Sequence, residues 1–164
     1  MSKNLISRLN ESPVICAEGY LFAMERRGYL QAGAFVPEVV LEHPEVVTQL
    51  HREFIRSGSD VVQAFTYYGH REKLRIIGKE DKLEALQKNA LKIAKDAANE
   101  FPDLDLMIAG NVANTCVYDP NDNSTIAECR KCLKNRLHGQ KKLVLILLWL
   151  KHCLGSKKQK LLLR

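Results

Sequence analysis

The alternation of apolar and polar positions is most regular between residues 45 and 74, where it predicts a helix followed by a buried strand. The apolar residues of the first part recur at intervals of three and four, as on one face of a helix; they are Val46, Val47, Leu50, Phe54 and Ile55. Gly58 is expected to end this helix, because glycine adopts the left-handed conformation that closes a last turn. The run from Asp60 to Thr66 is apolar and β-branched, which predicts a strand covered on both faces.

The same pattern predicts two more strands and a second long helix. Val14–Ala17 and Leu104–Ala109 are short apolar runs followed by glycine-containing turns, so each predicts a buried strand. Glu80–Glu100 has apolar residues at helical spacing and is followed by Pro102, which interrupts a helix. Shorter helices are expected over residues 2–8, over 20–27, over 37–56 with a break at proline 44, and from Ser124 onward.

Strands and helices therefore alternate along the chain, and this order requires a parallel sheet joined by right-handed crossovers. The sequence predicts an α/β fold. Tyr67, Tyr68 and His70 follow directly after the strand that ends at Thr66. Because α/β folds bind ligands beyond the carboxyl ends of parallel strands, we interpret this turn as a candidate site.

Four short motifs are distinctive: ERRGY (25–29), EHPEVV (42–47), QLHREF (49–54) and AFTYY (64–68). With these motifs, the chain from about Leu5 to Lys131 resembles the betaine–homocysteine S-methyltransferase group of the homocysteine methyltransferase family. The resemblance implies a partial (β/α)8 TIM barrel, its first three βα units, from a zinc-dependent enzyme that methylates homocysteine to methionine. A complete barrel of this kind needs about 250 residues, so the 164-residue chain is short for it.

The resemblance also implies three substrate-binding residues. The family has a Gly-Asp-Gly motif after its first strand, and the nearest carboxylate here is Glu18, because Ala17 takes the place of the aspartate. Phe35 stands where betaine-using members have a tryptophan, and Tyr68 matches a family tyrosine. Such rings attract the quaternary ammonium of a methyl donor such as betaine by a cation–π interaction. The alternative is that Phe35 packs in a loop and Tyr68 simply ends a strand.

The resemblance implies zinc as the cofactor, but its ligands have no counterpart in this sequence. The family holds the metal with three thiolates, one on a later strand and two in a Gly-Gly-Cys-Cys motif, and that motif is absent. Cys129 and Cys132 form a CxxC pair, which is half of a zinc site or a redox pair at most. We therefore predict no catalytic and no metal-binding residues, and an inactive fragment. The alternative is a non-enzymatic fragment that binds a full-length relative or chaperones.

Charge changes this interpretation only in the tail. Residues 1–131 have 16 basic and 19 acidic residues, a net charge of −3, whereas residues 132–164 have nine basic residues and no acid. Binding to nucleic acid or to a membrane would thus depend on the tail alone, and we expect neither. The apolar run Leu143–Leu150 is shorter than the roughly 20 residues that span a bilayer, and we interpret it as aggregation-prone. No signal peptide precedes Asn10, so we expect a cytoplasmic protein with reduced cysteines.

The tail from Cys132 onward can be tested against the genetic code. With codons TGT-TTG-AAG-AAC-AGA for Cys132–Arg136 and an A in front, the shifted frame reads Met-Phe-Glu-Glu-Gln. With compatible codons, chosen within the degeneracy of the code, it continues as Ile-Ala-Trp-Ala-Lys-Glu-Ala-Gly-Val-Asp-Phe-Ile-Val-Ala-Glu-Thr. This reads as an amphipathic helix and a buried strand, which the resemblance implies for the next part of the barrel. Our hypothesis is a barrel part over residues 1–131 and a frameshifted tail over 132–164. A gene-model error, a sequencing error, a mutation and alternative splicing all stay open as its origin.

Overall fold

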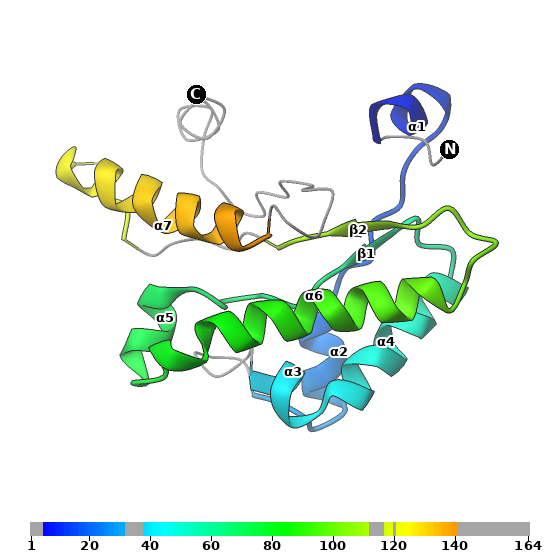
Figure 1. Ribbon diagram of the computed structural model, residues 1–164, viewed down its shortest axis with the longest axis horizontal. Coiled ribbons are helices and arrows are strands. Elements are labelled where there is room, and N and C mark those ends of the chain that lie inside the picture. The colour runs from blue at the N-terminus through cyan, green and yellow to red at the C-terminus, as the bar shows by residue number, and fades with distance from the viewer. Residues whose placement is uncertain (1–4, 32–37, 112–116, 120, 141–164) are drawn as a thin grey trace.

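The computed structural model describes residues 5–31, 38–111, 117–119 and 121–140. Helices and short strands alternate along this part of the chain (Figure 1). The elements are α1 (Leu5–Glu11), α2 (Tyr20–Arg26), α3 (Val39–Glu42), α4 (Pro44–Arg56), β1 (Val61–Gln63), α5 (Arg71–Ile76), the 3-10 turn η2 (Glu80–Lys82), α6 (Leu83–Asn99), β2 (Met107–Ala109) and α7 (Ser124–Gln140). The predicted mixed α/β architecture is confirmed.

The strands are parallel, as predicted, but shorter than expected. β1 pairs with β2 in the register Val61 to Met107 and Gln63 to Ala109, and Cys16 forms one parallel bridge to Val61. Tight backbone turns limit the ladder, because Thr66 N–H donates to Ala64 O at 2.8 Å and Leu106 N–H to Leu104 O at 2.8 Å. The predicted strand over residues 14–17 is reduced to a single bridge. Each of the other two predicted strands is three residues long, as β1 and β2.

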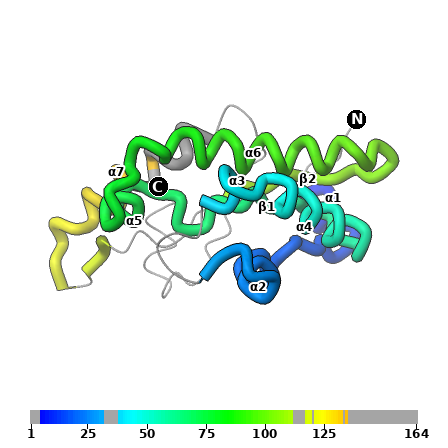
Figure 2. Tube along the Cα trace, turned by 90° about the horizontal axis from the view of Figure 1, so that it is seen from below, coloured from blue at the N-terminus to red at the C-terminus, as the bar shows by residue number. Residues whose placement is uncertain are grey.

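Side chains from β1 pack on both faces of the sheet, so the prediction of a strand covered on both sides is confirmed. Val62 belongs to a large apolar cluster with residues of α4 and α6, which lie side by side (Figures 1 and 2). Val61 faces the other way, because side chains alternate along a strand, and it packs in a small cluster with Leu5 of α1. Arg8 also ties α1 to the sheet through Asp105, with Nη2 2.9 Å from Oδ2.

α4 has the amphipathic pattern and the ending that the sequence predicts. Its buried residues are Val47, Leu50, His51 and Ile55. At its end Gly58 has φ +95°, its N–H donates to Ile55 O at 3.0 Å, and Ser59 N–H donates to Phe54 O at 3.1 Å. This pair of bonds is a Schellman motif, which satisfies two carbonyls at the end of the helix.

Two helices differ from the sequence-based expectation. α5 was not predicted, because a six-residue helix with Leu74 as its buried residue has too little apolar periodicity to be detected. α7 begins at Ser124 as expected, but Asp122 supplies the cap, since its Oδ1 accepts the Ser124 N–H at 2.8 Å. α7 also continues past Lys131, the proposed boundary of the tail.

No helix in the described ranges is both long and apolar enough to cross a membrane. The apolar run over residues 143–150 lies outside those ranges.

Candidate functional site

Glu18 lies at the carboxyl end of the sheet, just beyond the bridge between Cys16 and Val61. Ala17 N–H donates to Val61 O at 2.9 Å, so the backbone immediately before Glu18 is held against β1. Gly19 then has φ +84° and begins α2, which turns the chain sharply after Glu18. Oε1 of Glu18 is buried. The structure therefore places this carboxylate where a parallel sheet presents ligand-binding groups.

A buried Tyr20–His51 pair fixes the turn that follows Glu18. The Tyr20 hydroxyl and His51 Nδ1 are 2.9 Å apart, and both side chains are at least 97% buried. Burial raises the pKa of Tyr20 well above its usual value and lowers the pKa of His51 from 6.5 to about 4. Both groups are consequently neutral at pH 7. The Tyr20 ring also packs edge-on against Phe54, with ring centroids 4.8 Å apart.

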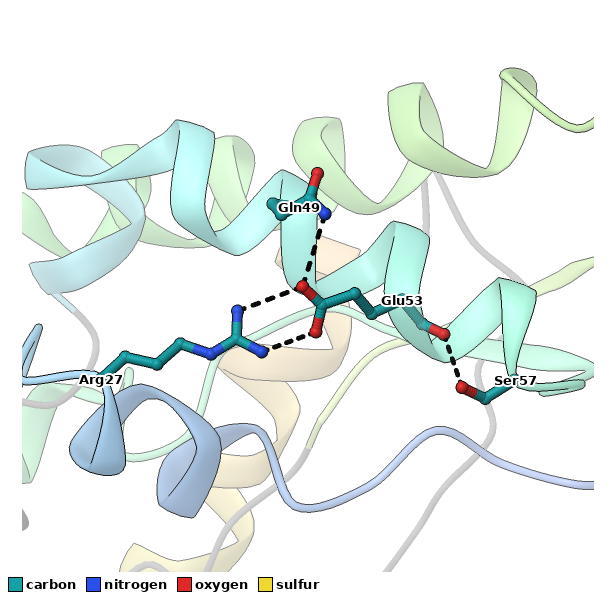
Figure 3. A network of polar contacts seen from close by, with 4 residues as sticks. All are labelled: Arg27, Gln49, Glu53 and Ser57. Carbon is teal, nitrogen blue, oxygen red and sulfur yellow. Dashed lines mark hydrogen bonds and ion pairs between the residues drawn. The ribbon is translucent and has the colours of Figure 1, made fainter.

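An ion pair on the surface holds α2 against α4 (Figure 3). Arg27, directly after α2, places Nη2 2.5 Å from Oε2 of Glu53, and Gln49 Nε2 is 3.4 Å from Oε1 of the same carboxylate. The hydrogen bond from Arg27 lowers the pKa of Glu53. Because the pair is more than a third exposed, its contribution to stability is modest. The buried Tyr20–His51 pair is the stronger constraint on the position of α2.

Tyr68 lies beyond the carboxyl end of β1 in an unusual backbone conformation. It has φ +58°, and among the described residues it is the one non-glycine residue with positive φ. Its ring lies 4.2 Å from the Tyr67 ring, and Lys73 Nζ lies 4.6 Å from its centroid. The Lys73 ammonium thus lies over the face of the Tyr68 ring, as in a cation–π contact. Thr66 Oγ1 donates to Asn111 O at 2.9 Å and ties this turn to the chain after β2.

Gln63 is a polar residue of this region that the sequence analysis did not single out. It lies at the end of β1, its side chain is 5% exposed, and Nε2 has no hydrogen-bond partner among the described residues. In the sequence, Gln63 could have been singled out because it is an amide within the otherwise apolar run from Val61 to Phe65. Phe35, the third predicted site residue, lies outside the described residues.

The described residues do not form a metal site by themselves. No three His, Cys, Asp or Glu side chains in this part of the chain lie close enough together to hold a metal ion. Cys129 is buried and Cys132 is half-buried on α7, and a structural zinc site needs about four ligands.

Known proteins with a similar sequence identify the family. The family model described as Homocysteine S-methyltransferase matches residues 18–149. The chain belongs to the homocysteine S-methyltransferase family. The resemblance seen in the sequence is thereby confirmed. The family match begins at Glu18, includes Tyr68 and runs past Lys131 into the predicted tail.

Two similar proteins are longer than this chain. Betaine–homocysteine S-methyltransferase 1 from Bos taurus is 42% identical over 123 residues, which cover 72% of this chain and 30% of the relative. The protein of the same name from Sus scrofa is 39% identical over 140 residues, covering 82% and 49%. The chain thus spans less than half the length of these relatives.

A solved structure of the same family shows the shared fold. The metallated form of the homocysteine methyltransferase MmuM from Escherichia coli superposes with a TM-score of 0.69 and 17% sequence identity. The match covers 87% of this chain and 55% of that enzyme. The described elements therefore correspond to part of a larger family fold.

Proposed function

We propose that this chain is the amino-terminal part of a homocysteine S-methyltransferase barrel, made of its first three βα units. The observation that carries the proposal is the position of Glu18 and Tyr68, which follow the carboxyl ends of neighbouring parallel segments in a chain of this family. In (β/α)8 barrels that end of the sheet forms the active site. The chain would contribute substrate-binding groups to this site.

Glu18 is the proposed group for the amino end of homocysteine. A carboxylate accepts charge-assisted hydrogen bonds from an ammonium group, and these are stronger when water is excluded. The buried Oε1 and the fixed turn at Gly19 and Tyr20 support this role.

Tyr68 is the proposed group for the methyl donor, together with Phe35. The names of the curated relatives point to betaine, which has a quaternary ammonium. The Lys73 ammonium above the Tyr68 ring supports the proposal, because it occupies the position that a cation–π ligand takes.

We expect the 164-residue chain by itself not to form methionine. Its described side chains do not fit a metal site, and its sequence has no adjacent pair of cysteines. The assay is methionine formation by the purified chain from L-homocysteine and betaine with added zinc. Zinc-dependent turnover would contradict the expected inactivity.

Binding of L-homocysteine to the purified chain, measured by calorimetry, tests the substrate-binding role. Glu18→Gln should weaken binding roughly 10-fold or more, because the charge-assisted hydrogen bond is lost. Glu45→Gln, an exposed carboxylate at the start of α4, is the matched control and should bind like the unchanged protein. Equal affinity of the two variants would exclude Glu18 from the site.

A second candidate function is non-enzymatic docking on a full-length relative. It is favoured by apolar side chains exposed at one end of the sheet: Ile6 and Leu9 of α1 are 66% and 52% exposed, and Ile15 is 58% exposed. Such surface is usually covered by other chain segments. Co-elution of the chain with an intact family member would support docking. Elution of the chain as a separate monomer in the presence of that family member would contradict it.

A further inference from the structure

A cavity of about 500 Å³ lies between α5, the start of α6 and α7. These three elements lie at the same end of the molecule (Figures 1 and 2). Arg71 and Arg75 line the cavity from α5, and Lys131 lines it from α7. The volume is that of a small-molecule site, and the cavity shares no residue with the proposed substrate site.

The cavity wall carries a net positive charge, because these three basic residues outnumber the two acidic ones, Glu72 and Glu128. Arg75 Nη2 lies 2.6 Å from Glu72 Oε2, so the charges of this pair compensate each other. Arg71 and Lys131 make no ion pair with any residue in the described part of the chain. Two cations from different helices are therefore available to one ligand.

The sequence of α7 adds further positive charge beside the cavity. No acidic residue follows Glu128 within α7, whereas several basic residues do. Two of them, Arg130 and Lys134, line a second hollow on α7 together with Lys131. Positive charges along one wall of a cavity raise the local concentration of anions, so this end of the molecule favours an anionic ligand.

The rest of the lining suits the neutral part of such a ligand. Gln87 is 8% exposed, and its Nε2 donates to Gly69 O at 3.2 Å, which fixes the amide at the cavity. A side-chain amide has two N–H groups, so the second can donate to an oxygen of the ligand. Leu83 and Val117 complete the wall with apolar side chains.

We propose that this cavity binds a phosphate monoester, with Arg71 and Lys131 on its phosphate group and Leu83 and Val117 against its organic part. The planar guanidinium of an arginine matches two phosphate oxygens, and a lysine ammonium binds the third as a point charge. A carboxylate has only two oxygens for the same donors. Glu128 disfavours a second anionic group on the ligand. The site depends neither on the proposed function nor on the predicted tail.

The test titrates phenyl phosphate, benzoate and phenol into the full 164-residue chain and follows binding by NMR. Phenyl phosphate should bind most tightly, and phenol, which has no charge, most weakly. Arg71→Gln and Lys131→Gln should each weaken binding of phenyl phosphate roughly 10-fold or more, because a charge-assisted hydrogen bond is lost. Arg26→Gln and Lys95→Gln, which change exposed cations of α2 and α6 outside the cavity, are the matched controls and should keep the affinity.

Glu128→Gln separates an effect of charge in the cavity from a structural effect. This variant should bind phenyl phosphate roughly two- to fivefold more tightly, because it removes a negative charge from the wall. The denaturant midpoint of unfolding should stay the same in Arg71→Gln, Lys131→Gln and Glu128→Gln, because all three side chains are exposed. Opposite changes of affinity at equal stability are not expected from a structural role.

Three results would overturn the inference. If the unchanged chain binds none of the three compounds at millimolar concentration, the cavity is not an anion site. If benzoate binds more tightly than phenyl phosphate, the ligand class is a carboxylate and not a phosphate monoester. If the control variants lose as much affinity as Arg71→Gln and Lys131→Gln, phenyl phosphate responds to the positive charge of the whole chain and not to this cavity.

Discussion

At the scale of single residues, the neutral pair of Tyr20 and His51 holds the candidate site in place. The two residues come from α2 and α4, and their 2.9 Å contact fixes the backbone two positions after Glu18. Because His51 is buried and its pKa is lowered, protonating it requires either unfolding or the burial of a charge. This pair therefore links the pH to the stability of the turn that carries Glu18.

His51 should make the stability of the protein decrease as the pH falls from 6.5 to about 4. In this window the unfolded chain binds a proton at His51 and the folded chain does not, so the free energy of unfolding falls with the pH. The full effect is on the order of 3 kcal/mol. Between pH 7 and pH 5 about 2 kcal/mol of it should be lost, which denaturant unfolding at the two pH values measures, and His51→Gln should reduce the difference. If His51→Gln shows the same difference in unfolding free energy between the two pH values, other titratable groups cause that difference.

Tyr68 should contribute its ring, and not its hydroxyl, to binding of a quaternary ammonium. Tyr68→Phe should keep the affinity for betaine, whereas Tyr68→Leu should lower it about fivefold, since a cation–π contact is worth about 1 kcal/mol. Titration of betaine followed by NMR measures both affinities. Lys73→Met is an informative companion, because it removes the ammonium that now lies 4.6 Å from the ring and should strengthen betaine binding. Equal affinities of Tyr68→Leu and the unchanged protein would contradict the role of the ring.

At the scale of elements, α4 and the β1 strand after it form the unit that places the site. α4 buries Val47, Leu50 and Ile55 against the core, and its Schellman ending at Gly58 directs the chain into β1. Glycine is required at position 58 for its backbone conformation, φ +95°. Lack of space is not the reason, because a Cβ at Gly58 would have no atom within 4 Å.

Gly58→Ala should lower the free energy of unfolding by about 1 kcal/mol, because φ +95° is strained for any residue with a Cβ. Chemical denaturation measures the loss. Gly58→Asn should lose less, since asparagine tolerates positive φ better than alanine does. An unchanged free energy of unfolding in Gly58→Ala would contradict this prediction, because the ending of α4 would then adapt to alanine without strain.

At the scale of the whole molecule, the part of the chain after Lys131 bears on the frameshift hypothesis. α7 runs from Ser124 to Gln140, and the family match reaches residue 149. Both features cross the boundary at which the shifted frame would begin. The frameshift therefore remains a hypothesis about the gene, and its test is made on nucleic acid.

Sequencing of the genomic DNA and the transcript across the codons for Arg130 to Leu133 tests the frameshift. We expect a one-base difference there, after which the frame continues as Met-Phe-Glu-Glu-Gln. A protein expressed from the corrected frame should then carry the missing barrel segments and bind homocysteine more tightly than the 164-residue chain. A transcript that encodes Cys132–Arg136 as written would instead establish the tail as a translated sequence.

The sequence by itself determined the longer helices, the positions of the strands, the mixed α/β class and the family. These depend on local periodicity and on short motifs, so α4 and α6 could be predicted from residues close together in the chain. It did not reveal α5, whose six residues are too few for a periodic signal.

Only the tertiary structure decided which side chains meet. Tyr20 and His51 are 31 residues apart, and Cys16 lies beside Val61 only because the sheet aligns two distant segments. Nor does the sequence show that Gln63 Nε2 has no hydrogen-bond partner among the described residues, whereas Gln87 Nε2 donates to Gly69 O. Whether a buried donor has a partner depends on backbone that folding brings from elsewhere in the chain, and no local pattern encodes that.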